Sequence, residues 1–215
     1  MKKIVLLAVL VVAYAQVSDA QMTFGGGPHV GIAAWGSPKY KWEGDPTNQE
    51  ISLFGTGLTF GGHGDLNVNK YFTGRFSIDY SMFGADNNAI KDLLVRANPN
   101  ADPALISFDG NDASVFSISV NGIGKLPVGG GFSPYALLGI GVHMASFSDA
   151  KVTYQGTPQP NASSSVKIES KTGFAVNFGL GLEYKLKFMK LFLDMQYTAA
   201  SGSGFLPITI GATFP

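Results

Sequence analysis

Apolar and polar side chains alternate without a break along residues 174–185. Every second residue is large and apolar: Phe174, Val176, Phe178, Leu180, Leu182 and Tyr184. The residues between them are small or polar. Because successive side chains of an extended strand point to opposite faces, this segment predicts a β-strand with one apolar face and one small or polar face. A half-buried strand of a soluble protein alternates in the same way, so the pattern alone does not identify the surroundings.

The same alternation recurs along the chain and predicts eight strands, at 24–36, 52–66, 71–84, 113–126, 133–147, 172–186, 190–200 and 205–214. The connections alternate between short turns, as at 67–70, and longer polar segments, as at 85–112. Short turns at one rim and longer loops at the other are typical of outer-membrane barrels. The predicted fold is therefore an all-β, eight-stranded antiparallel up-and-down transmembrane β-barrel.

Two strands depart from the simple pattern. The segment 25–28 reads Gly-Gly-Gly-Pro and interrupts the first strand, where Pro fits only at a strand start, an edge or a bulge. In the fourth strand the apolar Ile123 joins the polar row after Asn121, so we expect a bulge or the membrane edge there.

The first twenty residues have the organisation of an export signal. Lys2 and Lys3 precede an apolar run over 4–15, and Ser18-Asp19-Ala20 supplies the small residues that a signal peptidase reads. The run is shorter than the roughly 20 residues that a membrane-spanning helix needs. We therefore expect a signal peptide over 1–20, cleavage after Ala20, and a barrel domain over 21–215.

Composition favours a membrane over water as the surroundings of the barrel. Charged residues make up 14% of the chain, against about 25% in ordinary soluble domains. The formal net charge is +0, which gives no indication of nucleic-acid binding. The chain has no Cys, which excludes disulfides. A soluble lipocalin-like barrel with an apolar ligand cavity is an alternative. The apolar rows, however, hold more large side chains than an eight-stranded interior accommodates.

The fifth strand carries a Pro-Tyr pair, Pro134-Tyr135, followed by alternating Gly at Gly139 and Gly141. With the signal peptide and the eight strands, this resembles the small outer-membrane β-barrel proteins of the OmpA-barrel, OmpX and OmpW type. The resemblance implies a monomer in the cell outer membrane, in contact with lipid and lipopolysaccharide. It also implies recognition by the barrel-assembly machinery of a final aromatic residue, here Phe214 followed by Pro215.

Several ionisable residues fall on the rows predicted to face the lumen: Arg75, Asp79, Lys125, His143, Glu183 and Asp194. Charges in a narrow interior must pair. One hypothesis is a gate in which Arg75 exchanges carboxylate partners. The other is a permanent polar plug, which we favour because eight strands leave an interior just wide enough for side chains.

His29, His63 and His143 all fall on inward rows, yet no third metal ligand accompanies them. We expect hydrogen-bonded lumen histidines, and neither a metal site nor a cofactor. The sequence also indicates no pair of nucleophile and base, so we predict that the protein is not an enzyme.

Aromatic residues near both rims predict the girdles that anchor a barrel at its two interfaces. The loop rim would carry Trp35, Tyr40, Trp42, Phe83, Phe147 and Tyr197, and the turn rim Tyr71, Phe132, Tyr184 and Phe188. Loop 85–112 contains a helical pattern over 88–97, with Asp86 or Asn87 available as its cap. This loop is the predicted contact for an extracellular partner that the sequence does not identify.

These features predict a non-enzymatic outer-membrane barrel that acts as an envelope scaffold or a surface-loop interaction protein. A narrow channel or transporter for small solutes, apolar ones included, is the alternative, and the soluble lipocalin-like barrel is a second one.

Overall fold

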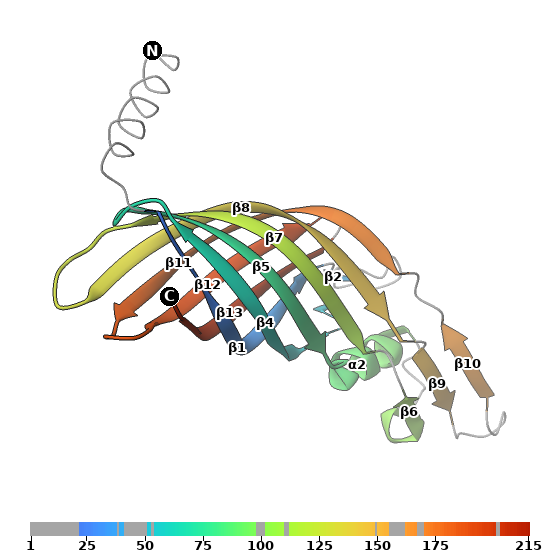
Figure 1. The fold of residues 1–215 in the computed structure, drawn as a ribbon. Coiled ribbons are helices and arrows are strands. Elements are labelled where there is room, and N and C mark those ends of the chain that lie inside the picture. The colour runs from blue at the N-terminus through green and yellow to red at the C-terminus, as the bar shows by residue number, and fades with distance from the viewer. Residues whose placement is uncertain are drawn as a thin grey trace, which may run out of the picture.

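The computed structural model describes residues 22–37, 39–40, 51–52, 54–97, 102–109, 112–148, 150–154, 162–166, 170–200 and 203–215. Eight antiparallel strands form a closed barrel (Figure 1). They are β1 (Thr23–Ser37), β4 (Thr56–Asn67), β5 (Phe72–Phe83), β7 (Ala113–Lys125), β8 (Phe132–Phe147), β11 (Lys171–Lys185), β12 (Lys190–Ala200) and β13 (Ser203–Thr213). The predicted fold and its eight strands are confirmed, whereas the expected signal peptide lies outside the described residues.

Each barrel strand pairs with its neighbours in the chain, and β1 closes the ring by pairing with β13 from His29–Gly211 to Ser37–Gly204. A closed ring leaves no strand edge. This matters because lipid cannot hydrogen-bond an unpaired backbone N–H or C=O. Closure therefore satisfies the backbone of every strand that crosses the membrane.

The barrel wall is apolar outside and small or polar inside. Leu138 and Leu180 on the outer face are 66% and 60% exposed, while Asn177 on the inner face is 0% exposed. This arrangement matches strands that cross lipid and enclose a polar interior. It contradicts the lipocalin-like alternative, which needs the apolar rows inside.

The interruption predicted at residues 25–28 does not occur, and Ile123 lies on the inner row as predicted but without a bulge. β1 continues through Pro28, which pairs with Gly62 of β4 and lies between the Gly26–Phe214 and His29–Gly211 pairs with β13. The predicted bulge at Ile123 is also wrong. Ile123 pairs in register with Thr73, is 0% exposed, and packs inside against Tyr135 and Leu137.

Further elements lie in the connections at the loop end: β2 (Lys39–Tyr40), β3 (Ile51–Ser52), α2 (Asn87–Ala97), the 3-10 helix η1 (Pro103–Leu105), β6 (Ile106–Asp109), β9 (Ala150–Tyr154) and β10 (Ala162–Val166). α2, β6, β9 and β10 gather at the end of the barrel opposite the C-terminus (Figure 1). α2 confirms the predicted helix, and Asp86 caps it by accepting a hydrogen bond from the Ala89 N–H at 3.1 Å. None of the helices among the described residues is long and apolar enough to span a membrane.

The strands β10, β9 and β6 form a separate three-stranded sheet in that order. This sheet was not predicted, because its segments lie in stretches that we assigned to loops.

Gly31 on the inner row of β1 sits directly against the backbone of β13. A Cβ at this position would collide with the Ile208 carbonyl oxygen and come within 2.7 Å of the Thr209 Cα. Gly31→Ala should therefore cost about 1–3 kcal/mol of unfolding free energy by overpacking. Urea unfolding in detergent, followed by heat-dependent mobility in gels, measures this loss.

Gly64→Ala on the outer row of neighbouring β4 is the matched control, since nothing lies within 4 Å of its Cβ position. Its stability should stay close to that of the parent protein. Equal losses in the two variants would contradict the proposed close approach of β1 and β13.

Candidate functional site: the barrel lumen

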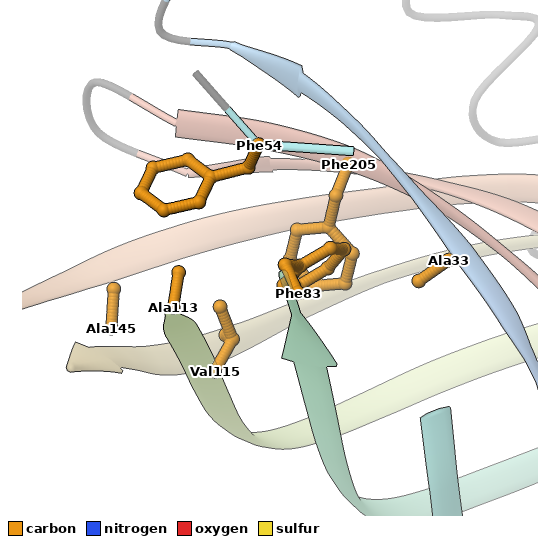
Figure 2. Close-up of a cluster of buried hydrophobic side chains, with 7 residues drawn as sticks. All are labelled: Ala33, Phe54, Phe83, Ala113, Val115, Ala145 and Phe205. Atoms are coloured by element: carbon orange, nitrogen blue, oxygen red, sulfur yellow. The ribbon is translucent and has the colours of Figure 1, made fainter. Parts of the chain in front are cut away.

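The loop end of the lumen is closed by a cluster of apolar side chains, here called the apolar plug: Ala33, Phe54, Phe83, Ala113, Val115, Ala145 and Phe205. The rings of Phe83 and Phe205 meet edge to face, with centroids 5.8 Å apart (Figure 2). Phe147 packs against the plug, and its ring centroid lies 5.7 Å from that of Phe54. These aromatic contacts fill part of the lumen at its loop end.

The predicted girdle position of Phe83 is wrong, since its side chain is 1% exposed inside the barrel. The rule of alternation explains the error. Ser77 and Ser81 on β5 face inward, so Phe83, two residues further, shares their face. Phe147 follows Ala145 on the inner row of β8 in the same way and is likewise not a girdle residue.

Below the plug, Arg75 of β5 is the centre of a buried ion-pair network. Its Nε and Nη2 donate to both carboxylate oxygens of Asp65 at 2.8 and 3.0 Å, and its Nη1 donates to Asp194 at 3.0 Å. Tyr135 donates its hydroxyl hydrogen to the other oxygen of Asp194. The guanidinium also stacks 4.4 Å from the ring centroid of Phe192. One cation thus joins strands β4, β5 and β12 across the interior.

A layer of amides and hydroxyls continues the network. Asn177 donates to Asn121 at 3.3 Å and accepts from Thr198 at 3.0 Å. Ser81 donates to Thr59 at 2.9 Å nearer the plug. These contacts satisfy polar groups that would otherwise be costly to bury.

The turn end of the lumen holds a second group of charges. Lys125 donates to Glu183 at 2.5 Å, and Lys190 Nζ lies 4.0 Å from the other oxygen of the same carboxylate. Lys190 donates to Asn67 at 3.0 Å. The carboxylate of Glu183 therefore contacts two ammonium groups.

Each of the three histidines lies inside the barrel with one ring nitrogen hydrogen-bonded. His29 pairs with Asp79, His63 with Thr213 at 2.8 Å, and His143 with Ser117 at 2.6 Å. The prediction of hydrogen-bonded lumen histidines is confirmed for this set. No group of three or more metal-ligating side chains occurs in the described part of the chain.

The prediction that no nucleophile lies beside a base is contradicted by the contact between Ser117 and His143. The two residues come from neighbouring strands and are 3% and 5% exposed. The contact uses Nδ1 of His143, and its Nε2 has no hydrogen-bond partner among the described residues. A reactive serine needs its base oriented by a third group, and none of the described residues supplies that contact.

The remaining predicted lumen residues lie inside as expected: Arg75, Lys125, His143, Glu183 and Asp194 are buried, and Asp79 is partly buried. The sequence analysis did not name two residues of the lumen ion pairs, Asp65 and Lys190. Asp65 shares the inner row of β4 with Thr59 and His63, a signal present in the alternation but obscured by five Gly in the predicted strand. Lys190 was missed because it lies at a strand end, where the alternation begins.

The turn-rim aromatics Tyr71, Phe132, Tyr184 and Phe188 are exposed at 41%, 45%, 36% and 67%. Tyr197 lies on the outer row of β12 with its ring 5.3 Å from that of Phe178. These positions suit a girdle. The side chains of Trp35 and Tyr40, and the whole of Trp42, lie outside the described residues.

The packed interior retains a cavity of about 40 Å³, lined by residues that include His29, Arg75, Asp79, His143 and Gln196. One water needs about 10–15 Å³ on this measure, so the space suits a few waters among polar groups.

The geometry defines a closed transmembrane barrel with a polar network in its lumen, and comparison places it in a family. The family model described as "Outer membrane protein beta-barrel domain" matches residues 4–205. The chain belongs to this outer-membrane β-barrel family, and it is a protein of the outer membrane. It matches no curated protein sequence.

The chain is similar to solved outer-membrane proteins of low sequence identity, and the first two named here share its fold. Outer membrane protein OprG from Pseudomonas aeruginosa is 13% identical with a TM-score of 0.50, over 93% of this chain and 98% of that one. A major outer membrane protein from Thermus thermophilus is 10% identical with a TM-score of 0.51, over 89% and 99%. Neisserial surface protein A is 15% identical with a TM-score of 0.49, over 90% and 98%.

Removing Arg75 should destabilise the barrel strongly. Arg75→Ala leaves Asp65 and Asp194 buried as uncompensated charges, which costs about 3–5 kcal/mol. Chemical unfolding in detergent measures the loss. Adding Asp65→Asn and Asp194→Asn to Arg75→Ala should recover a substantial part of it, because the stranded charges are then gone. A triple variant as unstable as the single one would refute this electrostatic cause.

Proposed function

We propose that this protein is a non-enzymatic barrel whose closed interior serves as a scaffold for the elements at its loop end. The observation that carries the proposal is the filled lumen. The apolar plug packs the loop side, and below it the Arg75 network joins strands across the middle. A barrel of eight strands has little interior left once such side chains are in place.

The loop end supports a role in surface contacts. α2 and the sheet of β6, β9 and β10 add ordered structure beyond the barrel wall (Figure 1). Ordered loops on a rigid scaffold are where binding residues concentrate. Loop 85–112, which contains α2, is the segment that we propose contacts an extracellular partner.

The absence of catalysis is part of the proposal. Ser117 and His143 are both buried between the apolar plug and the Arg75 network, where a substrate would have to displace packed side chains to reach them. A narrow, gated channel is the second candidate. It is favoured by one observation, namely that Arg75 already contacts two carboxylates on different strands.

Single-channel recordings in planar bilayers separate the two candidates. We expect the parent protein to show no conductance above background, because packed side chains and a cavity of about 40 Å³ leave no path for ions. The folded fraction of Arg75→Ala should also show no conductance if the Arg75 network is a permanent structural element and not a gate. Phe83→Ala is a second variant, which leaves the ion pairs intact, and its conductance is measured in the same way. Regular openings of the parent protein, or uptake of small solutes by liposomes containing it, would contradict the scaffold and support the channel.

A further inference from the structure

The turn end of the barrel contains a concave vestibule that the scaffold role does not explain. Its volume is about 650 Å³, which lies within the range of about 300–1,000 Å³ typical of small-molecule sites. Four lysines line it, Lys70, Lys125, Lys185 and Lys190, together with the single carboxylate of Glu183. The described lining therefore carries a surplus of three positive charges (four Lys minus one Glu).

Within the described lining, the contacts of these lysines add no second negative charge to that of Glu183. Glu183 is already shared between Lys125 at 2.5 Å and Lys190 at 4.0 Å. Lys190 donates to the neutral amide oxygen of Asn67, and Lys70 lies 4.8 Å from the ring centroid of Tyr71. None of these last contacts supplies negative charge. Like charges held around one hollow repel each other, and an anion placed among them relieves the repulsion.

The donor types point to a particular anion. Lysine ammonium groups act as strongly hydrated point charges and bind phosphate without the planar matching that arginine provides for carboxylates. Thr23, Asn67 and Ser133 add hydroxyl and amide donors to the same lining. Several ammonium groups with neutral donors between them suit a tetrahedral oxyanion that carries more than one charge.

We propose that this vestibule binds a phosphate-bearing ligand at the periplasmic side of the membrane. Short turns of outer-membrane barrels lie on that side. Tyr71 and Phe132 are exposed at this end, and aromatic side chains of this kind suit a membrane interface beside the opening. Two sources share this chemistry, a free phosphate compound in the periplasm and the headgroup of an inner-leaflet phospholipid.

The test is calorimetric titration of the folded full-length protein in uncharged detergent. The two probes are glycerol 3-phosphate and dihexanoyl phosphatidylglycerol. Lys190→Gln should weaken binding of the probe that occupies the site by about tenfold, the usual effect of removing one charged donor. Glu183→Gln should tighten binding several-fold, because it removes the competing carboxylate. Heat-dependent gel mobility verifies that each variant is folded.

Lys91→Gln in α2 is the matched control, since it removes the same charge at the opposite end of the molecule. It should leave the affinity unchanged. Tighter binding of the lipid than of glycerol 3-phosphate identifies a headgroup site, and equal or tighter binding of glycerol 3-phosphate identifies a soluble ligand. No saturable binding of either probe, or equal weakening by Lys91→Gln and Lys190→Gln, overturns the proposal. These measurements are independent of conductance, so they do not depend on whether the lumen is closed.

Discussion

Lipid offers no hydrogen bonds to a peptide backbone, and the rest of this structure depends on that constraint. The eight strands satisfy it by closing β1 onto β13, which leaves each strand with a neighbour on both sides. Closure with eight strands also makes the interior narrow. Side chains of the inner rows therefore meet across the axis, and charged ones such as Arg75 are forced into contact with partners on other strands.

The interior is divided by the chemistry of its side chains. Near the loops, Phe83 and Phe205 close the lumen by packing, which needs no exact partners. In the middle, Arg75 and Asp65 require a matched geometry, because an unpaired buried charge is very costly. The apolar plug shields this network from the loop side, and low local polarity in turn strengthens each ion pair. The two regions therefore support each other.

Alternation predicted the eight strands and the direction of most side chains, because a strand has a fixed period of two. The prediction for Phe83 was wrong because we did not apply this rule there. We assigned Phe83 to the rim from its place along β5, although alternation puts its side chain on the inner face. Other features cannot be read from a period. The contact between Arg75 and Asp194, 119 residues apart, depends on strand tilt and stagger. The strand Ala162–Val166 is almost entirely polar or small and is ordered by pairing with β9.

The two ends of the barrel differ in chemistry. The loop end combines the apolar plug with α2 and a separate sheet, the elements that we propose for contact with an extracellular partner. The turn end has a hollow lined by lysines around Glu183, where we propose that a phosphate-bearing ligand binds. Because Lys125 and Glu183 belong to both the lumen and the vestibule, an anion bound there would compete with Glu183 for Lys125. The charge network of the barrel thus extends from the lumen to the turn end.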